Sequence, residues 1–79
     1  MDYSYDYSKL EGRIREVFKT KTAFAEALGL SMRTLGLKLN GKRDFRQGEI
    51  LKSALLLDIP FKDICLYFFA LRVQNLTME

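Results

Sequence analysis

Apolar residues recur along the chain at the spacing of amphipathic helices, and turn residues separate the helical segments. Counting from Leu10, apolar residues fall at i, i+4, i+7 and i+8, which predicts one buried stripe on a first helix that ends near Phe18. The pattern predicts a second helix over about residues 20–28 and a third over about 32–39. Gly29 can adopt the left-handed conformation without steric cost, so it is expected to end the second helix.

Two further helices are predicted in the C-terminal half. Phe45 and Ile50 have the spacing of a hydrophobic staple around a helix over about 47–57. This helix carries more apolar residues than one buried stripe requires, so the surplus is a candidate dimer patch. Pro60 interrupts the helical pattern, and a fifth helix is expected over about 61–69.

Both ends of the chain show the alternation that is typical of a β-strand. Tyrosines alternate with polar residues over 3–7, and this segment is either an edge strand or a disordered arm. Ser8 and Glu11 then have the spacing of a capping box at the start of the first helix. Apolar residues alternate again over 69–73, which predicts a short C-terminal strand that pairs across a dimer. The alternative is an apolar tail folded back on its own core.

The segment 21–43, KTAFAEALGLSMRTLGLKLNGKR, has the pattern of a helix-turn-helix. Gly29 can form the turn, and Ser31 can cap the following helix through its hydroxyl group. Ala25 provides the small side chain that two closely crossing helices need. Asn40-Gly41 then predicts the end of the second of these helices.

At these positions the chain resembles the helix-turn-helix of the phage repressor and Cro-like family, the lambda-repressor-like DNA-binding domains. The matching residues are Ala25, Gly29, Ser31, Leu35 and Asn40-Gly41-Lys42. The resemblance implies an all-α, five-helix lambda-repressor-like helix-turn-helix domain, to which a short C-terminal and an N-terminal β-strand could be added. Residues 1–79 are then a single domain, with the helix-turn-helix at about 21–40 and a C-terminal tail at 70–79.

Composition argues against an enzyme. The chain has one cysteine and no histidine, which excludes an internal disulfide, a His-based zinc site and a His base. Acidic residues are scattered singly, so no pair of catalytic carboxylates is indicated, and no cofactor or metal is expected. Cys65 is expected to be a small buried hydrophobic residue rather than a reactive thiol.

The sequence also argues against a membrane protein. No apolar run approaches the ~20 residues that span a bilayer, and no signal-peptide pattern is found at the start. With 79 residues the core is small and tolerates few functional cavities, so no small-molecule substrate is expected. We expect a reduced, cytoplasmic protein.

Basic residues are concentrated in the middle of the chain. Residues 19–46 contain seven Lys or Arg against two Asp or Glu, whereas the net charge of the whole chain is +3. A basic centre with mildly acidic flanks attracts a polyanion to one face. The alternative is a solvated basic loop.

If Leu35 and Leu39 are buried, the third helix is a candidate recognition helix for the major groove of DNA. Arg33 is the strongest candidate for a base contact, because its guanidinium group can donate two hydrogen bonds to guanine. It could instead contact phosphate or remain exposed, and Leu37 could instead help to fill the core. The expected base-contacting residues are Met32, Arg33, Gly36 and Leu37. Residues with hydroxyl, amide or cationic groups around the motif are expected to contact DNA phosphate: Lys21, Thr22, Lys38, Asn40, Lys42, Arg43 and Arg46.

The leading interpretation is a sequence-specific regulator of transcription that binds double-stranded DNA, a phage or prophage Cro-like repressor on a pseudo-palindromic operator. One small module makes too few base contacts to select a site, so a homodimer is expected. The expected dimer-interface residues are Leu51, Leu55, Phe69, Leu71 and Val73. The alternative is a protein-interaction module of the same fold, an antitoxin or anti-repressor, that uses the apolar surface of the fourth helix and the C-terminal segment.

Overall fold

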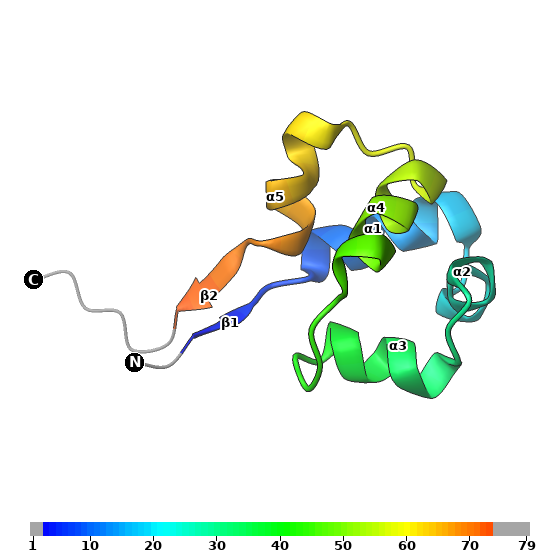
Figure 1. Ribbon diagram of the computed structural model, residues 1–79, viewed down its shortest axis with the longest axis horizontal. Coiled ribbons are helices and arrows are strands. Elements are labelled where there is room, and N and C mark those ends of the chain that lie inside the picture. The colour runs from blue at the N-terminus through cyan, green and yellow to red at the C-terminus, as the bar shows by residue number, and fades with distance from the viewer. Residues whose placement is uncertain (1–2, 74–79) are drawn as a thin grey trace, which may run out of the picture.

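The computed structural model describes residues 3–73, which form a small helical body with a two-stranded ribbon extending from one side (Figure 1). In chain order the elements are β1 (Tyr3–Tyr5), α1 (Ser8–Phe18), α2 (Lys21–Leu28), α3 (Met32–Leu39), α4 (Gln47–Leu56), the 3-10 helix η1 (Phe61–Asp63), α5 (Ile64–Phe68) and β2 (Leu71–Val73). The expected helices over 20–28 and 32–39 are confirmed, and the expected predominance of helix is confirmed as well. None of the helices described is long and apolar enough to cross a membrane.

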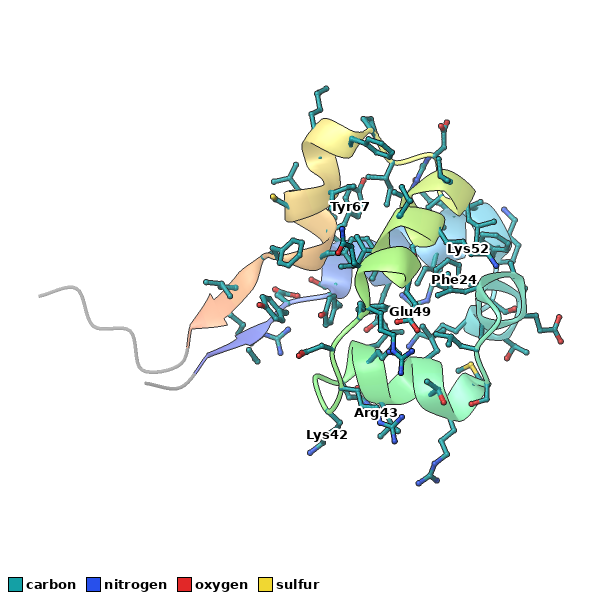
Figure 2. All side chains as sticks on the ribbon, viewed as in Figure 1. Phe24, Lys42, Arg43, Glu49, Lys52 and Tyr67 are labelled. Atoms are coloured by element: carbon teal, nitrogen blue, oxygen red, sulfur yellow. The ribbon has the colours of Figure 1, made fainter. Side chains whose placement is uncertain are left out.

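The core lies where the apolar faces of the helices meet. Leu10 and Ile14 of α1 are fully buried, as are Phe24 of α2 and Leu35 of α3. Figure 2 shows Phe24 in the interior of the helical body. Burying one such side chain contributes about 1.5–3 kcal/mol relative to leaving it exposed. The stripes predicted from the spacing of apolar residues therefore form the core.

Three helices end in the same hydrogen-bond pattern. After α2, the backbone N–H groups of Gly29 and Leu30 donate to carbonyls one turn back, at 3.1 and 2.9 Å, and Gly29 has φ 86°. This is a Schellman ending, which needs a left-handed residue just beyond the helix. Gly41 takes that position after α3 with φ 79°, and Asp58 takes it after α4 with φ 55°. The turn predicted at Gly29 is confirmed.

A serine hydroxyl caps α3 as predicted. Ser31 Oγ accepts a hydrogen bond from the Thr34 N–H at 3.0 Å. Thr20 caps α2 in the same way, with its Oγ1 3.1 Å from the Ala23 nitrogen. Each cap satisfies a backbone donor that the helix itself leaves free. The two helices that flank Gly29 therefore both begin at positions fixed by local sequence.

The start of α1 differs from the predicted capping box. Ser8 donates its N–H and its hydroxyl proton to Asp6 Oδ1, at 2.9 and 2.6 Å. Glu11 pairs with Lys21 instead, at 2.9 Å. The prediction was wrong because an ionised carboxylate two residues earlier is a stronger acceptor than a hydroxyl group. The two hydrogen bonds from Ser8 are the main cause of the lowered pKa of Asp6; desolvation opposes them, and the nearby Arg72 lowers the pKa further.

The strand-like patterns at the two ends meet in one antiparallel ribbon. Tyr5 of β1 lies opposite Leu71 of β2, and the Asp6 N–H donates to the Ala70 carbonyl at 2.7 Å. Both short strands are confirmed, and β1 is the edge strand that was one of two interpretations of the N-terminal segment. One edge of β2 pairs with β1 of the same chain, and pairing of its other edge across a dimer stays a prediction. The part of the expected tail beyond residue 73 lies outside the described residues.

Aromatic side chains anchor the ribbon to the helical body. The ring centroid of Tyr7 is 5.3 Å from that of Phe45, which in turn is 5.3 Å from that of Phe68. Both contacts are edge-to-face, an arrangement worth about 0.5–1.5 kcal/mol beyond the buried area. The start of α1, the loop before α4 and the end of α5 therefore share one aromatic cluster.

The C-terminal helix is shorter than predicted. The segment over 61–69 begins as the 3-10 helix η1 and continues as α5 only to Phe68. Phe68 is buried, whereas Cys65 is exposed. The expectation that Cys65 is buried was wrong, because a five-residue helix has only one inward face and Phe68, with its half-buried neighbours Ile64 and Tyr67, occupies it.

Candidate functional site

Exposed cations gather along α3 and the loop that follows it. Figure 2 shows Lys42 and Arg43 beside α3 at the edge of the molecule, with their side chains directed away from the body. Their backbone N–H groups donate to the Leu37 carbonyl at 2.8 and 3.3 Å, so the loop is folded back against the end of α3. We call the exposed polar residues of this region the basic surface: Arg33, Asn40, Lys42, Arg43 and Arg46.

The four residues predicted to contact bases are not equally accessible. Met32 is 42% exposed and Arg33 is exposed, whereas Gly36 and Leu37 are half-buried. A Cβ at Gly36 would meet no heavy atom of the described chain within 4 Å beyond its own turn of helix. The first turn of α3 and the backbone at Gly36 are therefore open to an approaching partner.

Lys38 was predicted to contact phosphate, and the structure corrects this prediction. Its side chain is 6% exposed, and its Nζ lies 2.8 Å from Glu49 Oε1 and 2.9 Å from the Asp44 carbonyl oxygen. The ammonium group is therefore occupied inside the protein. The sequence contained the signal, because Lys38 follows Leu35 by three residues, which makes the two neighbours on the helix surface.

Glu49 holds the other end of this buried pair. Figure 2 shows Glu49 on α4, facing α3. Its Oε1 also accepts the backbone N–H of Arg46 at 2.9 Å. Burial raises the pKa of Glu49, but the hydrogen bonds from Lys38 and from the Arg46 N–H together with the charge of Lys38 outweigh it and lower the pKa overall. Glu49 is therefore a carboxylate at neutral pH and ties α4 to α3.

The N-terminal end of α2 offers less free charge than expected. Thr22 is exposed as predicted, but Lys21 is only 33% exposed in its side chain and its Nζ lies 2.9 Å from Glu11 Oε1. This ion pair links α2 to α1. Arg46 precedes α4 and its side chain is exposed, so it extends the basic surface beyond the loop.

A second candidate surface is apolar and lies over α4, η1 and α5. A groove of about 480 Å³ between α4 and η1 is lined by Leu51 and Phe61. Ile50 belongs both to this groove and to a neighbouring one of about 320 Å³ that reaches Phe69. Leu55, one turn after Leu51, is 67% exposed. We call this set the apolar surface: Ile50, Leu51, Leu55, Phe61 and Phe69.

Three of the five predicted dimer-interface residues meet on this apolar surface: Leu51, Leu55 and Phe69. Leu71 is 55% exposed but lies on the ribbon, and the side chain of Val73 lies outside what the structure describes. Phe61, at 63% exposed, was missed by the sequence prediction. Its signal was the excess of apolar residues in 61–69 over what a small core can bury.

The described residues do not suggest metal chemistry. Within residues 3–73, no group of three or more His, Cys, Asp or Glu side chains is arranged to hold a metal ion. The two candidate surfaces therefore offer charge and apolar area, which are the means of binding a macromolecule.

Comparison with known proteins finds a matching family and a similar solved structure. It is similar to the modulator of repression (MOR) of the temperate bacteriophage TP901-1 from Lactococcus lactis, whose solution structure superposes with a TM-score of 0.74 at 50% sequence identity. The similarity covers 84% of this chain and 89% of that one. Among curated proteins, none matches the chain. The sequence pattern of the DUF739 family, described as a protein of unknown function, matches residues 3–71, and the chain therefore belongs to that family.

Proposed function

We propose that this protein regulates phage gene expression by binding a repressor protein through its apolar surface. The observation that carries the proposal is the continuous pair of grooves along α4, with large apolar side chains at both ends. The similarity to a phage modulator of repression supports a repressor as the partner. The role requires a binding equilibrium and no catalytic step.

The apolar surface leaves large side chains exposed that a partner protein would bury. Leu51 and Phe69 are each 47% exposed and Phe61 is 63% exposed. Burying one such side chain against a partner would contribute roughly 1.5–3 kcal/mol to binding. A few side chains that fill well-packed, desolvated pockets carry most of the energy of an interface. The same surface could bind a second copy of the chain, which is the homodimer expected from the sequence.

Calorimetric titration with the repressor encoded in the same genome tests the proposal. Leu51→Glu, in the wall of the larger groove, should weaken binding by at least about 30-fold, which is the effect of losing a hot-spot residue. Met32→Glu is the matched control, because Met32 is 42% exposed but lies in the first turn of α3. Tight binding that both variants retain would place the repressor elsewhere. Sedimentation of the chain alone separates the repressor complex from a homodimer.

Direct DNA binding is the second candidate function, favoured by the basic surface. We infer that α2 and α3 form a lambda-repressor-like helix-turn-helix, with buried Ala25 at the crossing, Gly29 in the turn and Ser31 as the cap. A Cro-like homodimer would then place two α3 helices in successive major grooves. The basic surface would contact phosphates beside each groove.

Salt dependence separates the two candidates. Binding to phosphates weakens steeply between about 50 and 200 mM salt, whereas an apolar interface is little affected. Selection from a random pool of duplexes at about 150 mM salt should enrich an inverted repeat if DNA is the target. No enrichment, together with a salt-insensitive repressor complex, would leave protein binding as the function.

A further inference from the structure

A polar cavity lies between the ribbon, α1 and the end of α3. Its volume is about 310 Å³. Arg15 of α1 and Arg72 of β2 line it, from elements far apart in the sequence. Their side chains are 63% and 56% exposed. The lining also includes the hydroxyl groups of Ser4 and Ser8 and the amide of Asn40.

The acidic residues beside the two arginines are engaged by other donors. Glu11 Oε1 lies 2.9 Å from Lys21 Nζ but 3.9 Å from Arg15 Nη2, which is beyond hydrogen-bond distance. Glu11 is therefore neutralised mainly by Lys21. The guanidinium group of Arg15 keeps its donors free for a ligand in the cavity.

Arg72 is in a similar position. Asp6 Oδ1 accepts two short hydrogen bonds from Ser8, at 2.9 and 2.6 Å, and lies 3.3 Å from Arg72 Nη2. That last contact is longer than the ~2.7–2.9 Å of a charge-assisted hydrogen bond. Asp6 therefore positions Arg72 at the cavity without saturating it.

The cavity is continuous with the basic surface. A neighbouring cavity shares Ser4 and Tyr5 with it and is lined on its other side by Gly41 and Arg43. Asn40, which belongs to the basic surface, also lines the first cavity. Arg15 and Arg72 therefore line one cavity and Arg43 lines the adjoining one, with Glu11 and Asp44 as the acidic residues of the two linings.

We propose that Arg15 and Arg72 form a binding site for a phosphate group of the DNA backbone. The planar forks of two arginines, with the hydroxyl group of Ser4 and the amide of Asn40 beside them, suit the oxygens of a phosphate. The site extends the contact with DNA beyond α3 to the ribbon, which no sequence pattern indicated. This inference rests on the DNA-binding candidate function and adds a contact point to it.

Fluorescence anisotropy with a labelled mixed-sequence duplex of about 20 base pairs tests the site, with salt varied between about 50 and 200 mM. The slope of log Kobs against log salt should fall by about 0.9 for Arg15→Gln or Arg72→Gln and by about 1.8 for the double variant. Arg72→Lys keeps the charge and should keep most of the slope. Lys62→Gln is the matched control, because Lys62 is 82% exposed on η1 at a distance from the cavity in the fold. Thermal melting confirms that each variant is folded.

Three results would overturn the inference and can be told apart. If the double variant keeps the wild-type slope while Lys42→Gln lowers it, the DNA-binding candidate stands and this site is wrong. If the folded wild-type protein binds no duplex at the lowest salt, both are wrong. Titration with inorganic phosphate distinguishes a free phosphate ligand from a phosphate of the DNA backbone. The amide NMR shifts of Ser4 and Ser8, which line the cavity, report the binding. Saturable binding there without any contribution to the duplex slope would assign the site to free phosphate and contradict the proposal.

Discussion

Lys38 Nζ of α3 lies 2.8 Å from Glu49 Oε1 of α4, and the two side chains are only 6% and 18% exposed. The aromatic ring of Phe45 lies on the same ammonium group, with its centroid 5.9 Å from Nζ. A buried pair of this kind tolerates little change in geometry, because either charge alone would be strongly destabilising. The pair therefore fixes the rotation of α3, and with it the exposure of Arg33.

Removing one charge of this pair should destabilise the fold. Glu49→Gln leaves the Lys38 ammonium buried with a weaker partner and should lower the free energy of unfolding by about 2–4 kcal/mol, measured in urea. Glu16→Gln is the matched control, since Glu16 is 68% exposed in its pair with Arg13 and should cost less than about 1 kcal/mol. Equal losses of unfolding free energy in the two variants would show that the Lys38–Glu49 pair stabilises the fold no more than an exposed ion pair. Lys38→Met with Glu49→Leu should recover most of the stability, because an apolar pair needs no desolvated charge.

The same pair predicts a dependence of stability on acid pH. The folded-state pKa of Glu49 is lowered below its ordinary value of 4.5. Its contribution to stability is therefore complete above about pH 4.5 and is lost as the pH falls through the lowered folded-state pKa. The difference in unfolding free energy between wild type and Glu49→Gln should be constant from about pH 7 to 5 and shrink towards pH 3. A difference that grows on acidification would contradict this assignment.

Asp58 predicts a gain in stability from one substitution. It takes the left-handed position after α4 with φ 55°, where Gly29 and Gly41 stand after α2 and α3. A side chain with a Cβ is disfavoured in that conformation, so Asp58→Gly should raise the free energy of unfolding by about 0.5–1 kcal/mol. Asp58→Ala also removes the charge but keeps the Cβ, and it should be less stable than Asp58→Gly. The reverse order would mean that the Asp58 side chain makes a stabilising contact.

Local signals in the sequence were enough to predict the segment from α2 to α3. Gly29 and Ser31 act on backbone groups within one turn of helix, and such effects can be inferred from neighbours in the chain. The burial of Ala25 was also correctly predicted, because Ala25 precedes Leu28 by three residues on the inward face of α2. The predicted helices and their apolar faces follow from the same short-range periodicity.

Features that depend on distant residues could not be predicted in this way. The burial of Lys38 depends on Asp44 in the loop after α3 and on Glu49 of α4, and the spacing of apolar residues indicates neither contact. The pairing of β1 with β2 joins the two ends of the described chain, and alternation alone does not identify the partner strand. The exposure of Cys65 depends on the shortness of α5. The cavity lined by Arg15 and Arg72 also depends on a long-range contact, because α1 and β2 are far apart in the sequence.

Ser53 of α4 predicts a second stabilising substitution. Its side chain is fully buried, and its Oγ has no hydrogen-bond partner among residues 3–73. Burying a hydroxyl group without a partner costs free energy, and alanine is also the better helix former. Ser53→Ala should therefore raise the free energy of unfolding by up to about 1 kcal/mol in thermal or urea unfolding. A clear loss of stability would indicate that an ordered water satisfies the hydroxyl group.

Arg33 and Lys42 should differ in how they affect DNA binding, if the second candidate function holds. Arg33 is exposed in the first turn of α3, where its fork can reach base edges, so Arg33→Ala should cost about 1–3 kcal/mol at particular base pairs and relax the preference there. Lys42 lies in the loop after α3, where its charge can contact phosphate but cannot distinguish bases. Lys42→Ala should therefore weaken binding to all DNA sequences similarly and lower the salt slope by about 1. Competition between duplexes that differ at single positions measures both effects. A uniform loss for both variants would assign Arg33 to phosphate as well, and it would leave the sequence preference to DNA shape or to a partner protein.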